Sequence, residues 1–174
     1  TQYFPTAGNA TFWNHPSVVE GAAAGYTEFS VYGTGDYVNE PTAGEATFYN
    51  LRGKVSGATG GYTTFSGSSN AANAKLVAFG GNNGGYGGRI EFYDDSIGGE
   101  ATVELYGNGE LDISYHTHEL TIGSLQLFGG TIILQLGSKP TSLILTQKLI
   151  LNSDKVVFSF PEDDGKYEYD KPYA

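Results

Sequence analysis

The amino-acid sequence predicts an all-β, single-domain protein that forms a parallel β-solenoid, and three observations lead to this fold class. Thr, Tyr, Phe, Val and Ile, which suit a pleated sheet, are abundant, and 26 Gly residues supply turns. No segment carries a sustained helical stripe of apolar residues, and the alanines of 22–25 are too few for a helix. Two short strand patterns also recur along the chain at matching intervals.

The first recurring pattern combines small residues with an apolar strand. It reads Ala-Gly-Asn-Ala-Thr-Phe at 7–12 and Ala-Gly-Glu-Ala-Thr-Phe at 43–48. Weaker copies stand at 71–76 and 98–103, so successive copies begin 36, 28 and 27 residues apart. Alternate residues within each copy are small or apolar, which is typical of a strand with one buried face.

The second pattern begins with Gly and ends with an apolar residue. It reads Gly-Tyr-Thr-Glu-Phe at 25–29 and Gly-Tyr-Thr-Thr-Phe at 61–65, with later versions at 88–92 and 109–113. These copies begin 36, 27 and 21 residues apart, so the two series drift together along the chain. Each unit of the chain therefore carries at least two short strands.

Further features of each unit follow from the segments between these patterns. We expect a third strand around Val55 and its equivalents, and turn insertions at Val31–Pro41 and Gly80–Gly87. A unit of two or three strands cannot bury its own apolar face, whereas stacked units share one continuous core. The alternative fold is a β-sandwich of antiparallel hairpins, which also has short strands and regular turns.

Residues 1–119 are predicted to form the repeat coils, and the chain changes character after them. Residues 120–160 are more apolar and contain less Gly, and we interpret them as the last coils and a cap that covers the open core. Residues 161–174 form an acidic, Tyr-rich tail. Because Tyr167, Tyr169 and Tyr173 share one face of an extended strand, we expect this tail to be held either by its own domain or by another copy. In the second case it is an inter-subunit strand and these tyrosines are interface residues.

Charge and composition exclude several classes of protein. The 174 residues include nine Lys and Arg against nineteen Asp and Glu, a net charge of −10. This balance argues against nucleic acid as a partner, and no apolar stretch is long enough for membrane insertion. The absence of Cys excludes disulfides, zinc ribbons and thiol nucleophiles, and the absence of Met indicates a mature product or an excised piece.

No catalytic residues are predicted. The adjacent Asp pairs are Asp94-Asp95 and Asp163-Asp164, and neighbours in a strand point to opposite faces, so neither pair by itself can flank one substrate. Asp94 and Asp95 precede two glycines and are interpreted as turn residues. No Gly-x-Ser-x-Gly nucleophile elbow is present. We therefore expect a protein that is not an enzyme.

Two further groups of residues are candidates for binding or modification. His116 and His118 would lie on one face of a strand and supply two metal ligands, on the wet side opposite Leu111, Ile113 and Tyr115. A zinc site needs three or four ligands, so we predict no metal and no cofactor here. Asn9 begins the glycosylation sequon Asn-Ala-Thr.

The repeats resemble those of a known group of bacterial proteins. The pattern Ala-Gly-Asn-Ala-Thr-Phe, followed by Gly-Gly-Tyr-Thr-Thr-Phe-Ser-Gly-Ser-Ser-Asn-Ala, resembles the Gly/Asn/Thr-rich repeats of autotransporter passengers and related surface β-helix proteins. The apolar segments at 130–137, 142–146 and 148–152 are similar to the module that closes many passengers. The resemblance covers about residues 7–160 and implies a right-handed β-helix.

The resemblance also implies a function. Members of this group are secreted to the cell surface and act mostly without catalysis, in adhesion and in building matrices or sheaths. We therefore expect an extracellular structural or adhesive protein whose partners are other copies of itself, joined head to tail into fibres, or a surface polysaccharide. The alternative is a carbohydrate-binding or polysaccharide-cleaving β-helix, which would need a groove with several Tyr and at least two carboxylates from different coils.

Overall fold

The computed structural model describes residues 5–31, 40–136, 140–153 and 155–160, and these residues form strands and turns without a helix. The apolar alternation of the sequence becomes a series of short strands followed by three longer ones. The strands are β1 (Thr11–Asn14), β2 (Tyr26–Phe29), β3 (Thr47–Asn50), β4 (Tyr62–Phe65), β5 (Lys75–Ala78), β6 (Arg89–Phe92), β7 (Thr102–Asp112), β8 (Glu119–Ile133), β9 (Ser142–Leu151) and β10 (Val157–Ser159).

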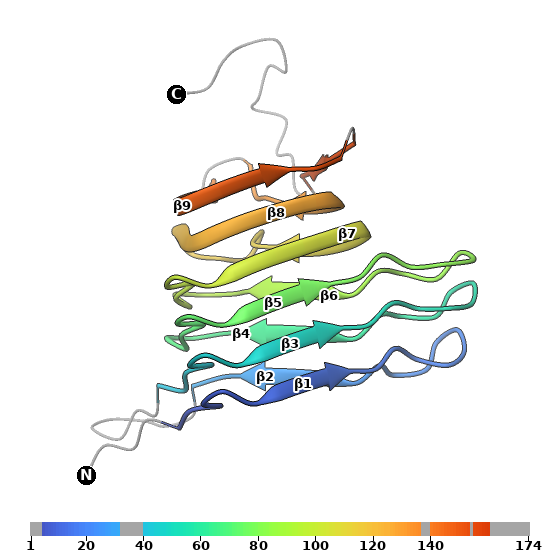
Figure 1. Ribbon diagram of the computed structural model, residues 1–174, viewed down its shortest axis with the longest axis horizontal. Coiled ribbons are helices and arrows are strands. Elements are labelled where there is room, and N and C mark those ends of the chain that lie inside the picture. Colours follow the sequence, from blue (N-terminus) through green and yellow to red (C-terminus); the bar gives the residue numbers. More distant parts are fainter. Residues whose placement is uncertain (1–4, 32–39, 137–139, 154, 161–174) are drawn as a thin grey trace.

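The chain winds through six stacked turns, which we call rungs (Figure 1). The first three rungs hold β1 with β2, β3 with β4, and β5 with β6; β7 and β8 each form one rung, and β9 with β10 form the sixth. β1, β3, β5, β7, β8 and β9 pair in this order on one face, and β2, β4, β6, β7, β8 and β10 on the other. Every pairing between these strands is parallel, so the antiparallel β-sandwich is wrong.

Both repeat series predicted from the sequence are confirmed by the strand register. The first series places Thr11, Thr47, Lys75 and Thr102 in one column across the rungs. The second series places Tyr26, Tyr62, Arg89 and Glu110 in another column. The chain is therefore a parallel, barrel-like coil whose equivalent residues lie above one another.

Phenylalanine rings stack in columns inside the coil. Phe12 and Phe48 stack with ring centroids 4.8 Å apart. On the opposite face Phe65 stacks on Phe29 and on Phe92, with both centroid distances 5.0 Å. Phe48, Phe65 and Phe92 are fully buried, and the later rungs continue the core with Val, Leu and Ile. The phenylalanines are therefore aligned in columns, as a stacked coil requires, because each ring lies against the equivalent ring of the neighbouring rung.

Two expectations about the segments between the strands are wrong. Val55 lies in an exposed turn, because this part of the rung leaves the core and cannot bury an apolar strand face. Gly80–Gly87 is not an insertion, since residues 15–25 and 51–61 form equivalent arms that project beside it (Figure 1). Residues 32–39 of the expected insertion at Val31–Pro41 lie outside the described residues.

The glycines of these arms are required by close backbone packing. A Cβ atom on Gly60 would overlap the carbonyl oxygen of Gly87 in the next arm. A Cβ atom on Gly61 would overlap the carbonyl oxygen of Asn14 in the preceding rung. Only Gly permits such an approach of one backbone to another, so the arms stack as closely as the strands do.

The C-terminal end of the coil differs from the expected cap. Most residues of β9 are exposed, and an apolar cavity of about 490 Å³ opens at this end, lined by side chains that include Leu125, Leu149, Leu151 and Phe158. Among the described residues nothing seals this cavity, because β9 and β10 pair only with β8. The tail at 161–174, with Tyr167, Tyr169 and Tyr173, lies outside the described residues.

In the part of the chain that the structure describes, no helix is long and apolar enough to cross a lipid bilayer. No break separates residues 119 and 120, because β8 begins at Glu119, pairs with β9 from that residue and pairs with β7 from Ser124. Residues 120–133 therefore extend the same stack that residues 5–119 begin.

Replacement of Phe65 by Ala tests the stacked core. The substitution removes the central ring of a buried column and leaves a cavity, so we expect the free energy of unfolding to fall by about 3–5 kcal/mol. Urea unfolding followed by circular dichroism measures this loss. Tyr86→Ala is the control, because Tyr86 is an exposed ring on an arm and should change stability by less than about 0.5 kcal/mol. Equal losses in both variants would contradict the role of the column.

Candidate functional site

Side chains capable of chemistry gather in two places. The first, the His116 pocket, is a cavity of about 560 Å³ lined by residues 95–100 and by His116, His118, Glu119 and Thr121. The second, the carboxylate face, is the outer surface of β6 and β7 that carries Glu91, Glu110 and Asp112. Each site is formed by residues of adjacent rungs, because stacking brings residues that are distant in the sequence close together.

The two histidines do not lie on a strand as expected. β7 ends at Asp112, whose Oδ1 accepts hydrogen bonds from the backbone N–H of Ser114 at 2.9 Å and from its hydroxyl at 2.7 Å. This local bonding turns the chain, so His116 is buried and His118 is exposed. The expectation that both imidazoles lie on the wet side is therefore wrong for His116, and Tyr115, placed on the buried face, is exposed.

Both ring nitrogens of His116 are engaged by the backbone. Nε2 lies 2.8 Å from the carbonyl oxygen of Ser96 in the neighbouring turn, so it donates a proton to that oxygen. Nδ1 then accepts from the backbone N–H of His118, 3.3 Å away. The imidazole thus ties two turns of adjacent rungs together, which is a structural use of the side chain.

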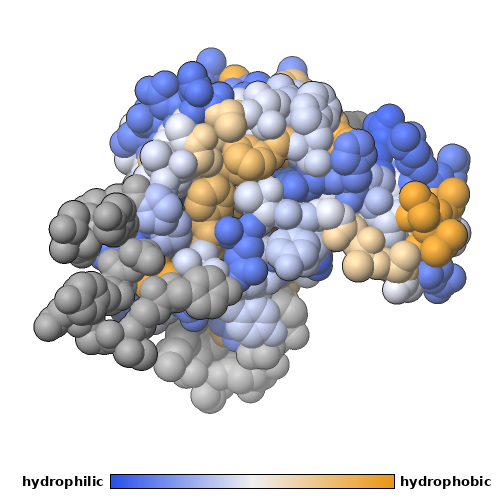
Figure 2. Space-filling view, turned by 90° about the horizontal axis from the view of Figure 1, so that it is seen from below, coloured by the Kyte–Doolittle hydropathy of each residue, from blue (hydrophilic) through white to orange (hydrophobic). Residues whose placement is uncertain are grey.

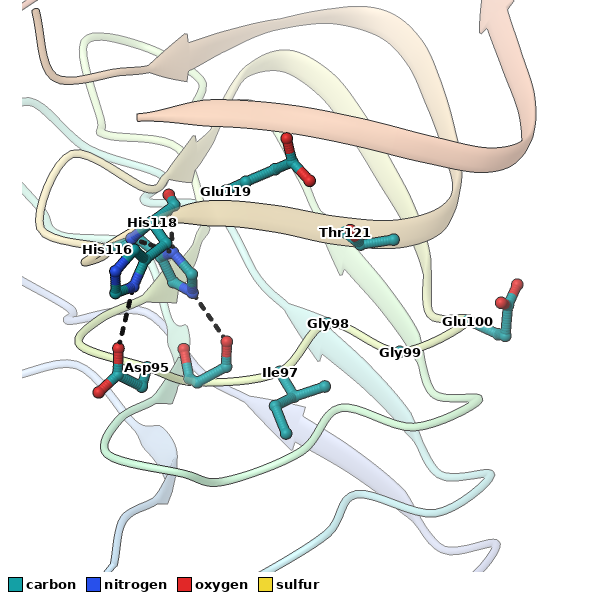
Figure 3. Close-up of a pocket in the computed structure, with 10 residues that line it drawn as sticks. Asp95, Ile97, Gly98, Gly99, Glu100, His116, His118, Glu119 and Thr121 are labelled. Atoms are coloured by element: carbon teal, nitrogen blue, oxygen red, sulfur yellow. Dashed lines mark hydrogen bonds and ion pairs between the residues drawn. The ribbon is translucent and has the colours of Figure 1, made fainter. Parts of the chain in front are cut away.

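His118 and the carboxylates of the pocket complete this picture (Figure 3). Nδ1 of His118 lies 3.3 Å from Oδ1 of Asp95, and both side chains are exposed. Glu100 lies at the opposite end of the pocket from the imidazoles. Among the described residues no group of three or more His, Cys, Asp or Glu side chains is close enough to hold a metal ion.

The carboxylate face was not recognised from the sequence. Glu91 of β6 lies beside Asp112 of β7, and Arg89 lies beside Glu110 in the same register. Glu91 and Asp112 occupy equivalent positions in the second repeat series, 21 residues apart. The 21-residue interval between these two copies of the repeat therefore predicts that Glu91 and Asp112 lie side by side. A search for carboxylates that are adjacent in the sequence does not find this pair.

Hydrogen bonds and an ion pair occupy two acidic side chains of this face, Glu91 and Asp112. Glu91 accepts a 2.7 Å hydrogen bond from the Thr64 hydroxyl at Oε2, and its Oε1 lies 3.4 Å from Nη2 of Arg89. Burial raises the pKa of the Glu110 carboxyl, with Asp112 and Glu91 adding to the effect and Arg89 opposing it. Burial also raises the pKa of the neighbouring Tyr93 hydroxyl. The face is a packed network of polar side chains.

Aromatic rings also line the outside of the coil, but they mostly cover one another. Tyr62 lies between the Tyr26 ring, with centroids 5.1 Å apart, and the Arg89 guanidinium, 5.2 Å from the Tyr62 centroid. A second outer stack runs through Trp13, Tyr49, Phe79, Tyr106 and Phe128, with centroid distances of 4.3–6.2 Å. A sugar ring needs an open aromatic face to stack on. Inside these two stacks the ring faces are covered by neighbouring side chains, so they do not offer such a face.

The remaining candidates are placed as follows. Asn9 is exposed in the turn before β1, a position open to modification. Asp94 lies in a turn with φ of 55°, as its interpretation as a turn residue requires, and its Oδ2 accepts a 3.2 Å hydrogen bond from the N–H of Gly67.

Comparisons of the chain with protein-family models, with curated proteins and with solved structures found no match. The resemblance to autotransporter passengers therefore stays a prediction from the sequence.

The pKa of Glu110 leads to a pH-dependent prediction. A carboxyl whose folded pKa is raised contributes stability that is fully present below the ordinary value of 4.5 and is lost as the pH rises through the folded pKa. Glu110→Gln removes this loss, so the variant should gain stability relative to the parent chain as the pH increases. Urea unfolding at a series of pH values from roughly 4 to 8 measures the difference. Glu45→Gln, at an exposed position, is the control. Curves that run parallel for Glu110→Gln and the parent chain would contradict the prediction.

The geometry of His116 leads to a prediction about metals. Because both of its ring nitrogens bind backbone groups, added Zn²⁺ or EDTA should leave the thermal midpoint of unfolding unchanged. His116→Ala should lower that midpoint, since it leaves the Ser96 carbonyl without its partner, whereas His118→Ala should have little effect. A zinc-dependent rise in the midpoint that both substitutions abolish would contradict this interpretation.

Proposed function

We propose that the chain is a right-handed β-solenoid that serves as a non-enzymatic structural or adhesive protein at the extracellular cell surface. The observation that carries the proposal is the in-register stack itself, in which each of the rungs lends its neighbour a buried apolar face. A stack of this kind makes a long, stiff body from few kinds of residue, which suits a structural role.

The state of the polar side chains supports a role without catalysis. A catalytic acid or base must be free to contact a substrate, and it needs a site that holds the substrate against it. Glu91 and His116 instead bind groups of the protein on both sides. The proposed location outside the cell rests on the resemblance of the repeats to those of surface β-helix proteins.

The carboxylate face favours one alternative function. It combines Glu91 and Asp112 from two rungs with Tyr62 and Tyr93, which are the kinds of side chain that a polysaccharide-cleaving or carbohydrate-binding coil would use. The raised pKa of Glu110 would also suit a general acid. This face is therefore the place where an enzymatic activity would be found if the chain had one.

A panel of neutral and acidic polysaccharides separates the two functions. Incubation with the purified chain should release neither new reducing ends nor unsaturated products, because Glu91 and Asp112 are engaged by protein groups. Retention on an immobilised polysaccharide without cleavage would support the adhesive form of the proposal.

Release of products would overturn the structural function. The cleavage should then disappear in Glu110→Gln and Asp112→Asn and persist in Glu45→Gln, which changes an exposed carboxylate away from this face.

A further inference from the structure

The two ends of the stack expose opposite edges of the same parallel arrangement. Among the described strands, β1 pairs only with β3 and β2 only with β4, while β9 and β10 pair only with β8. An unpaired strand edge carries free N–H and C=O groups and is a template for another strand. Because each rung adds to the previous one in a single direction, the free edge of the last rung has the geometry that the first rung of another copy requires.

If a second copy is added at the last rung, the columns of the core continue into the first rung of that copy. On one face the column through the six rungs runs Phe12, Phe48, Leu76, Val103, Leu125 and Leu149. On the other it runs Thr27, Thr63, Ile90, Leu111, Ile132 and Phe158. An added copy in register therefore places Phe12 on Leu149 and Thr27 on Phe158, so that inward residues meet inward residues.

Both ends leave apolar surface uncovered. At the last rung Leu149, Leu151 and Phe158 are each more than half exposed around the open cavity. At the first rung Trp13 and Tyr26 are also more than half exposed. Figure 2 views the molecule from the first-rung end and shows an apolar strip across its centre between hydrophilic regions. Large exposed apolar surfaces of this kind mark sites of association.

The aromatic stacks are also open at the first rung. Trp13 stacks on Tyr49, and Tyr26 stacks on Tyr62, so each first-rung ring has one face covered by the second rung. No described ring lies against the other face of Trp13 or Tyr26. In the register above, these faces meet Ile150 and Val157 of the neighbouring copy.

The charges of the two ends are complementary. The described residues of the first rung, 5–31, carry Glu20 and Glu28 without any Lys or Arg. The described residues of the last rung carry Lys148 and Lys155 without any Asp or Glu. Contact between two first rungs or two last rungs would bring like charges together, whereas contact between unlike ends brings an acidic end to a basic end.

We propose that the last rung of one copy of this chain docks under the first rung of a second copy, in the register that sets Leu149 against Phe12 and Phe158 against Thr27. The joint extends the parallel sheet and the core across the boundary. It is heterologous, so it leaves a free end on each side and builds an open fibre. This inference rests on the proposed structural function and names the partner as a second copy.

Full-length variants blocked at one end test the joint. Trp13→Glu with Tyr26→Glu blocks the first rung, and Leu149→Glu with Phe158→Glu blocks the last rung. The intact chain should show a mass that rises with concentration in light scattering, and rods in negative stain. Each blocked variant alone should be monomeric, and an equal mixture of the two should give particles of twice the monomer mass, because each variant keeps one functional end.

Tyr86→Glu with Tyr115→Glu is the matched control, since these rings are equally exposed but lie on the sides of the coil. It should assemble as the intact chain does, and circular dichroism should show that every variant is folded. Loss of assembly in this control, or assembly of either blocked variant alone, would overturn the proposed joint.

A monomeric intact chain would overturn the inference as well, and would mean that the chain covers its own last rung, with residues 161–174 as the available segment. The polysaccharide assay keeps the two proposals apart. Cleavage of a polysaccharide would contradict the proposed structural function and would leave the mass measurements unaffected. A monomeric chain that does not cleave polysaccharides would contradict only the proposed joint.

Discussion

The structure depends on one constraint, the in-register parallel pairing of equivalent residues in successive rungs. This pairing satisfies the backbone groups of strands that are only four residues long, and it sets each buried side chain on its equivalent. Phe65 between Phe29 and Phe92 shows the result, because a single rung would leave both faces of that ring in water. The same constraint acts on the arms, where Gly60 and Gly61 allow one backbone to lie against the next.

Polar residues are subject to the same rule as apolar ones. In-register stacking brings Glu91 beside Asp112 and Arg89 beside Glu110, although these residues are about 20 positions apart in the sequence. The resulting network binds its own charges and partly buries them, which raises the pKa of Glu110. In such a coil the neighbours of a charged strand residue are set by its column, as they are for Glu91 and Arg89.

The repeats made most of the fold predictable, because intervals of 21 to 36 residues between the copies determine which residues pair. The segments outside the repeats were less predictable. Strand alternation placed His116 on a wet face, but the Asp112 carboxylate bonds its own backbone and ends β7, so the chain turns and buries the imidazole. Val55 was expected in a third strand of the unit, yet only the structure shows that this segment leaves the core. The carboxylate face could have been predicted from the interval between the copies of the second repeat series.

The winding of the chain has a mechanical consequence. Among the described residues, the strands of each rung pair only with strands of the rungs above and below it. Tension applied between the two termini would therefore load the outermost rung first and peel it away before the next one yields. The chain would extend in a series of small unfolding steps, each releasing about one rung. The molecule would therefore dissipate work gradually instead of rupturing at one threshold force.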